Sequence, residues 1–173
     1  MINSDRIICL DGEINEISSL NAIVQLLNFN SENKNEPIYL VINSGGGSIL
    51  HGLGLYDVMK HIEAPVYTLC TGLAASMGSF LLSCGEKGHR AALKHSRILI
   101  HQPLIDREGS PTGKKESDLR RTLESIKKSR NILETIMAEN TNQPLEKLHK
   151  DCERDNWMNS EEALAYGLID EIL

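Results

Sequence analysis

The sequence predicts an α/β protein with a mostly parallel sheet. Short apolar runs typical of buried strands alternate with segments whose apolar residues have helical spacing. Residues 38–42 form a run typical of a strand buried on both faces. The chain has 173 residues, of which 40% are hydrophobic and 24% charged, and this composition argues against disorder, collagen-like repeats and a coiled coil. We therefore expect one domain over residues 1–173.

The first half of the chain is expected to supply most of the sheet. Residues 7–10 predict a strand closed by a turn at Asp11-Gly12, and Ser18 or Ser19 is expected to cap the next helix. That helix has apolar residues at helical spacing: Leu20, Ile23, Val24 and Leu27. The predictions that follow residues 38–42 are a glycine-rich turn at 43–48, a helix ending before Pro65, a strand at 66–70, a helix at 74–82, and strands at 90–93 and 97–100.

The second half predicts mainly helix. Residues 104–115 read as a loop, and residues 116–139 as a long amphipathic helix. The basic side chains of that helix are explained more simply by a solvent-exposed face than by a nucleic-acid site. A short helix follows at 159–166, with Glu162 placed for a capping box and Gly167 as its stop.

Composition also limits the partners and the compartment. The net charge is 18 − 24 = −6, which argues against a general nucleic-acid binder. The mostly apolar stretch at 73–82 is too short for a membrane span, and no secretory signal is recognisable, so we expect no membrane contact. The histidines show no metal-ligand spacing, so we expect no metal. The cysteines, none in a Cys-x-x-Cys pair, fit reduced thiols in the cytoplasm: Cys9, Cys70, Cys84 and Cys152.

Ser76, followed by Met77, is placed where a strand turns into a helix. A serine there can stand exposed while the next amide points to the same space, as a nucleophile with an oxyanion donor requires. The small residues around it equally suit close helix packing. The amides of residues 43–48 could bind phosphate or an oxyanion, although an ordinary tight turn explains them as well.

His101 is the histidine that directly follows a predicted buried strand, at the edge of the sheet where ligand-binding loops gather. Asp155 supplies a carboxylate before Trp157, but an isolated aspartate is usually a surface charge. Periodicity alone does not select it.

Four segments together resemble the proteolytic subunit of the caseinolytic Clp protease. They are Ile38-Tyr-Leu-Val-Ile-Asn-Ser44 with its glycines, Gly72-Leu-Ala-Ala-Ser-Met-Gly78, His95-Ser-Arg-Ile-Leu-Ile-His-Gln-Pro103, and Glu153-Arg-Asp-Asn-Trp-Met158 leading to Tyr166-Gly-Leu-Ile-Asp170. The resemblance implies a crotonase-like (ClpP-like) α/β fold with a protruding handle at about 104–139. It also implies an endopeptidase with Ser76 as nucleophile, His101 as general base and acid, and Asp155 as the orienting carboxylate. The amides of Gly46 and Met77 would form the oxyanion hole.

The resemblance also implies partners. It predicts a homo-oligomer of two stacked seven-membered rings that takes in protein and peptide substrates, and Glu153 and Arg154 are candidate oligomer contacts. No cofactor is expected in this subunit, because an AAA+ unfoldase would use the ATP. At the family's unfoldase-binding positions Val41, Thr71 and Ala91 are small or polar, beside larger residues at Tyr39, Leu69, Leu93 and Leu173. Since apolar burial contributes roughly 25 cal/mol per Å², we expect weakened or altered docking.

Three departures from the family pattern are visible. Gly45 stands where the family usually has proline, the segment before Ile7 is shorter than usual, and the loop at 104–115 is longer. Two rival hypotheses remain at this stage. One is a catalytically inactive or partner-dependent scaffold subunit of a mixed ring, and the other is an acyl-CoA enzyme of the wider crotonase superfamily, which the set Ser76, His101 and Asp155 disfavours.

Overall fold

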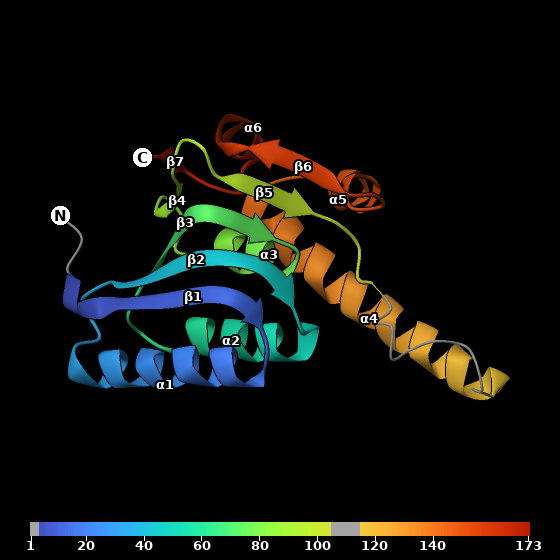
Figure 1. Cartoon of the computed structure of the whole chain (residues 1–173), viewed down its shortest axis with the longest axis horizontal. Helices are drawn as coiled ribbons and strands as arrows, with labels where there is room; N and C mark the ends of the chain where they lie inside the picture. Colours follow the sequence, from blue (N-terminus) through green and yellow to red (C-terminus); the bar gives the residue numbers. More distant parts are fainter. Residues whose placement is uncertain (1–3, 105–114) are drawn as a thin grey trace.

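The chain folds into a twisted sheet with helices packed on it and one long helix extending away from it (Figure 1). The computed structural model describes residues 4–104 and 115–173. The strands are β1 Ile7–Ile14, β2 Ile38–Gly47, β3 Val66–Ala75, β4 Arg90–Ala92, β5 Arg97–Ile100, β6 Asn156–Asn159 and β7 Glu171–Ile172. The helices are the short 3₁₀ turn η1 Ser4–Arg6, α1 Glu16–Glu32, α2 Ile49–His61, α3 Met77–Ser83, α4 Glu116–Thr141, α5 Leu145–Asp151 and α6 Ser160–Tyr166.

The sheet is mostly parallel, as predicted, and it divides at β3. Strands β1, β2, β3, β4 and β7 form a continuous parallel path. Beyond its contacts with β4 at residues 68–70, β3 pairs with β5 through residues 73–75. Strand β6 then lies antiparallel to β5. The carboxyl ends of β3 and β5 therefore point to the same edge of the sheet.

Only one face of the central sheet is fully covered, which corrects the prediction for residues 38–42. Along β2 the side chains of Ile38, Leu40 and Ile42 are fully buried, whereas Tyr39 and Val41 are half-exposed. Helices α1, α2 and α3 cover the buried side. The alternation is that of a strand with one core face and one partly solvated face.

The start of the chain differs from the prediction in two ways. Strand β1 does not end at Asp11-Gly12, because Gly12, with φ 75°, forms a bulge in its pairing with β2 and the strand continues to Ile14. Helix α1 is capped by Asn15, whose side chain accepts from Ile17 N–H and Ser18 N–H. Ser18 completes the capping box instead of capping the helix itself.

The side of α1 that faces the core is not the side with most of its large apolar residues. Leu20, Val24 and Leu27 are 45–55% exposed, and the residues that face the core are Ser19, Ala22 and Leu26. The smaller side chains let the helix lie close to β1 and α2. The larger ones form an apolar outer stripe on α1.

The later elements follow the prediction more closely. Helix α4 covers the predicted helix and extends to Thr141, and it projects from the sheet as a handle (Figure 1). Asn159 and Glu162 form the predicted capping box of α6, and Gly167, with φ 92°, ends that helix. The structure adds α5 and β6, for which no prediction was made. Most of the loop predicted at 104–115 lies outside the described residues.

Candidate active site

Ser76 occupies a strained turn between β3 and α3. Its φ of 56° and ψ of −121° are unusual for a residue with a side chain and cost of order 1–3 kcal/mol. The backbone on both sides fixes this turn, since Ser76 N–H donates to Leu99 O at 3.0 Å and Phe80 N–H donates to Ser76 O at 3.0 Å. Its side chain makes no capping hydrogen bond with α3. The Oγ is therefore available for chemistry.

His101 and Asp155 meet because β5 and β6 are antiparallel. Ile100 pairs with Asn156 at the end of the ladder, so the next residues outward, His101 and Asp155, lie opposite each other. His101 Nδ1 is 3.5 Å from Asp155 Oδ1, with side chains that are 10% and 66% exposed respectively. A short charged hydrogen bond measures roughly 2.7–2.9 Å. The two groups are thus adjacent but not tightly bonded.

The register of β3 and β5 brings Ser76 to the same place. Ala75 pairs with Leu99, so Ser76 follows the last paired residue of β3 just as His101 follows the last residue of β5. Three consecutive strand ends, those of β3, β5 and β6, therefore carry the three predicted catalytic side chains. Neighbouring strand backbones are about 4.8 Å apart, so side chains that follow adjoining strand ends can reach one another.

Gly46 lies directly against the serine turn. A Cβ at this position would be 2.7 Å from Ser76 Cβ, 2.8 Å from Ala75 O and 3.1 Å from Met77 N, and the φ of Gly46 is +96°. Only glycine fits there. Gly46 and Met77 are thus neighbours, as an oxyanion hole made from their amides requires. The Gly46 N–H, however, donates to Ser44 Oγ at 3.0 Å.

Ser44 is a structural component of the site that the sequence analysis did not single out. It is 1% exposed, and its Oγ donates to Gly12 O at 2.5 Å while accepting from Gly46 N–H. Its backbone also touches α3, because a Cβ on Gly78 would be 3.0 Å from Ser44 O. Ser44 therefore ties the glycine turn to the β1 bulge. The sequence feature that could have indicated Ser44 is a polar residue close to the end of a run of apolar strand residues.

The predicted oligomer contacts lie beside the site but point to solvent. Glu153 and Arg154 are both exposed in the segment that leads to Asp155. The carbonyl of Glu153 accepts from Gln102 Nε2 at 2.8 Å. Their exposed side chains are accessible to a neighbouring subunit.

The described part of the chain contains neither a cluster of metal-ligating side chains nor a membrane-spanning helix. Within residues 4–104 and 115–173 no group of three His, Cys, Asp or Glu side chains is arranged to hold a metal ion. No helix in those ranges is both long and apolar enough to cross a bilayer. The cysteines described there are free thiols, and burial raises the pKa of Cys84 and Cys152 to about 12. Thiols with such a pKa are poor nucleophiles.

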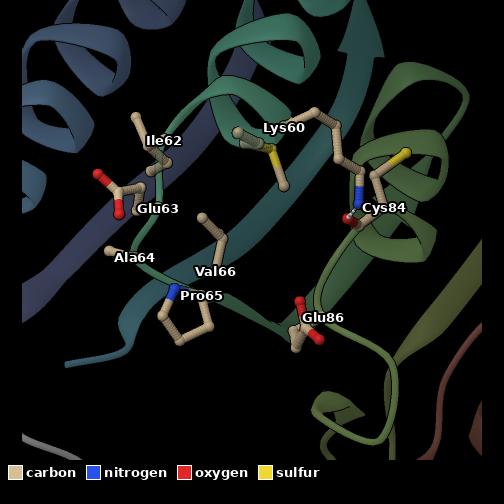
Figure 2. Close-up of a pocket in the computed structure, with 9 residues that line it drawn as sticks. Lys60, Ile62, Glu63, Ala64, Pro65, Val66, Cys84 and Glu86 are labelled. Carbon is tan, nitrogen blue, oxygen red and sulfur yellow. Dashed lines mark hydrogen bonds between the residues drawn. The ribbon is translucent and has the colours of Figure 1, made fainter. Parts of the chain in front are cut away.

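A cavity of about 400 Å³, whose lining residues are drawn in Figure 2, lies at the start of β3, and Ser76 follows the end of that strand. It is lined by residues at the end of α2 and the start of β3, among them Ile62, Ala64 and Val66. Lys60 Nζ at its margin donates to Cys84 O at 2.9 Å. Since Val66 begins β3 and Ser76 follows its end, this cavity is not part of the candidate active site.

The arrangement at the sheet edge defines a class of protein. A strained serine near a histidine and a carboxylate on adjoining strand ends, with a glycine turn pressed against it, is the arrangement that α/β serine hydrolases use. The family model "Clp protease" matches residues 1–173. The chain is also 45% identical over 172 residues to the ATP-dependent Clp protease proteolytic subunit 2 of Prochlorococcus marinus (strain NATL2A), an alignment that covers 99% of this chain and 84% of that protein. The chain belongs to the Clp protease family and is a serine protease of the Clp type.

Proposed function

We propose that this subunit hydrolyses peptide bonds of unfolded proteins and short peptides with Ser76 as nucleophile, His101 as general base and then acid, and Asp155 as the orienting carboxylate. The observation that carries the proposal is the position of the strained Ser76 next to the His101–Asp155 pair at adjoining strand ends. The family match gives the inactive scaffold no support.

In the first half-reaction Ser76 Oγ attacks the peptide carbonyl carbon while His101 Nε2 takes the serine proton. His101 Nδ1 keeps its proton facing Asp155, which stabilises the imidazolium. The C–N bond then breaks, His101 donates the proton to the leaving amine, and an acyl-serine ester remains. In the second half-reaction His101 deprotonates a water that attacks this ester, and the proton returns to Ser76 Oγ.

The developing oxyanion is bound by the amides of Met77 and Gly46 in this proposal. Donors fixed by the fold stabilise the negative charge without reorganising, and removing one typically costs about 10²–10³-fold in kcat. Because Gly46 N–H already donates to Ser44 Oγ, substrate must compete with that hydroxyl for the donor.

A chain of this family works in an oligomeric ring with Clp ATPases. The finer proposal is two stacked heptamers of this subunit in the cytoplasm, with α4 between the rings and Glu153 and Arg154 in subunit contacts. Exposed apolar residues on α1 and α2 support burial between subunits: Ile17, Leu20, Val24, Leu27 and Leu50. The subunit itself needs no cofactor, since ATP is used by the partner unfoldase.

The half-exposed face of the sheet is the proposed unfoldase-docking face. Tyr39 on β2 packs edge-on against Tyr67 on β3, with ring centroids 5.5 Å apart, and Tyr67 stacks on His89 at 3.9 Å. Ala91 is only 8% exposed, so it adds little apolar area. We propose weakened or altered docking, in which Tyr67 partly replaces the area missing elsewhere. Ordinary affinity for a Clp ATPase in a pull-down would contradict this proposal.

The decisive experiment labels the nucleophile. A fluorophosphonate should form one covalent adduct on Ser76, identified by peptide mass spectrometry, and Ser76→Ala should form none. Native mass spectrometry on the same samples reports the ring. An assembled protein that never forms the adduct and never cleaves a peptide would overturn the proposed mechanism.

A further inference from the structure

A hydrogen-bonded network connects α4 with the two backbone segments that carry His101 and Asp155. Its centre is Gln102, the residue after His101. Gln102 N–H donates to Cys152 O at 2.6 Å, and Gln102 Nε2 donates to Glu153 O at 2.8 Å. Through its backbone and its side chain, this one residue holds the His101 segment against the segment that leads to Asp155.

Arg130 on α4 fixes the other end of the Gln102 side chain. Arg130 Nη1 donates to Gln102 Oε1 at 3.0 Å, and Nη2 donates to His149 O at 3.1 Å. With its oxygen bound to a guanidinium, the Gln102 amide can only present its NH₂ group to Glu153. The charged donor also makes this hydrogen bond stronger than a neutral one.

Glu134, one turn along α4, holds Arg130 in place. Arg130 Nε donates to Glu134 Oε1 at 2.7 Å, and His149 Nδ1 lies 2.7 Å from Glu134 Oε2. The Glu134 side chain is 7% exposed and that of Arg130 is 19% exposed. A carboxylate buried to this extent is stable only when paired. The position of the guanidinium is therefore fixed by burial and charge together.

The site needs such support because the contact between its own members is loose. His101 Nδ1 and Asp155 Oδ1 are 3.5 Å apart, and the Asp155 side chain is 66% exposed. Nothing in that contact itself prevents the carboxylate from drifting. Gln102 adds two hydrogen bonds between the two segments, beyond the end of the β5–β6 ladder.

We propose that Gln102 and Arg130 are positioning residues for peptide hydrolysis, which hold the His101 imidazole and the Asp155 carboxylate in line for proton transfer to and from Ser76. The inference rests on the proposed function. It adds an internal brace from α4 to the site, separate from contacts between subunits.

The test compares Gln102→Met, which keeps the side-chain length without donors or acceptors, with Arg130→Ala and Arg130→Lys. On a short fluorogenic peptide, Gln102→Met and Arg130→Ala should lower kcat about 10- to 100-fold, as misplacement of catalytic groups does, with KM within about twofold of the starting protein. Arg130→Lys should recover part of the loss, because an ammonium still donates to Gln102 Oε1. A double variant of Gln102→Met and Arg130→Ala should lose little beyond either single change.

Arg120→Ala is the matched control. Arg120 makes the same type of pair four residues apart on α4, with Glu116 at 2.7 Å, but both side chains are more than 70% exposed and far along the helix from Gln102. Its kcat should stay unchanged, with native mass confirming assembly. If Gln102→Met keeps kcat within twofold while it assembles normally, the inference is wrong. If Arg130→Ala fails to assemble, the result for Gln102→Met alone decides the inference. If the unmodified protein neither hydrolyses peptide nor forms the Ser76 adduct, the proposed function is wrong instead.

Discussion

The serine side of the site and its acid–base side are held in place by different means. Ser76, Met77 and Gly46 are fixed by packed backbone, with Ser76 backbone hydrogen bonds of 3.0 Å and no room for a side chain at Gly46. Asp155 lies on an exposed segment, 3.5 Å from His101, and depends on polar side-chain links. Closely packed backbone has one arrangement, whereas a hydrogen-bonded segment has several of similar energy. Control of activity should therefore act on the acid–base side.

The largest loss is expected from Gly46→Ala on the serine side. The added Cβ would meet Ser76 Cβ at 2.7 Å and Ala75 O at 2.8 Å, at a φ that disfavours alanine. The turn must shift, so we expect kcat to fall on the order of 10³-fold through loss of oxyanion stabilisation. Gly45→Ala is the matched control, because its Cβ has no atom within 4 Å. Equal activity of the two variants would show that the serine side is not rigid.

Asp155→Asn tests the acid–base side of the site. Asparagine keeps the shape but cannot stabilise an imidazolium, a change that costs about 10⁴-fold in kcat where the aspartate is buried. Because Asp155 is exposed and 3.5 Å from His101, we expect a smaller fall in kcat, on the order of 10²-fold. The melting temperature should stay within a few degrees, because the side chain is 66% exposed. Steady-state kinetics and thermal unfolding on the same preparation check both statements. Unchanged kcat would remove Asp155 from the mechanism.

Ser44→Ala should affect stability more than chemistry. The hydroxyl bridges Gly12 O and Gly46 N–H, and its loss leaves both groups without that partner, at a cost of about 1–2 kcal/mol in unfolding free energy. Released from Ser44, the Gly46 N–H becomes a freer oxyanion donor, so kcat should change less than about tenfold. Urea unfolding and peptide turnover measure the two effects.

Ser19→Ala is a suitable control for that experiment. Its buried hydroxyl donates to Asn15 O in α1, away from the site. A kcat for Ser44→Ala as low as that of Gly46→Ala would mean that the hydroxyl has a direct catalytic role.

Features that depend on residues close together in the sequence could be predicted, whereas features that depend on residues far apart could not. The serine turn, the strand before His101 and the capping box of α6 depend on neighbouring residues, and patterns of a few positions indicate them. The resemblance supplied Asp155, since its pairing with His101 requires β6, for which the sequence analysis made no prediction. Spacing along the chain does not reveal a strand of four residues that forms only against β5.

The exposed face of α1 shows a second limit. Leu20, Val24 and Leu27 have good helical spacing, yet they face away from the core. Within one subunit, periodicity identifies an apolar face but not the surface that covers it. The Gln102 network was missed for a related reason, because Gln102 and Arg130 are 28 positions apart and only the fold brings them together.

The smallest effect is expected at the base of α4, which is its C-terminal end around Asn140. This is the helix whose Arg130 contacts Gln102 on the acid–base side. Arg90 there donates to Asn140 O and pairs with Asp170. Burial alone would raise the pKa of Asp170, but its hydrogen bonds and charge contact with Arg90 lower it more, so the folded pKa lies below the ordinary 3.8. This pair thus contributes stability that is fully present above about pH 4 and is lost as the pH falls toward the folded pKa.

Urea midpoints between pH 7 and pH 3 should therefore decrease for the starting protein and decrease less for Asp170→Asn, which lacks the titrating group. Part of the decrease should remain in the variant. The pKa of Asp151 is also lowered, since hydrogen bonds from Lys147 and Tyr166 and the charge of Lys147 outweigh its burial. Identical pH dependence in both proteins would show that the Arg90–Asp170 pair does not stabilise the folded chain.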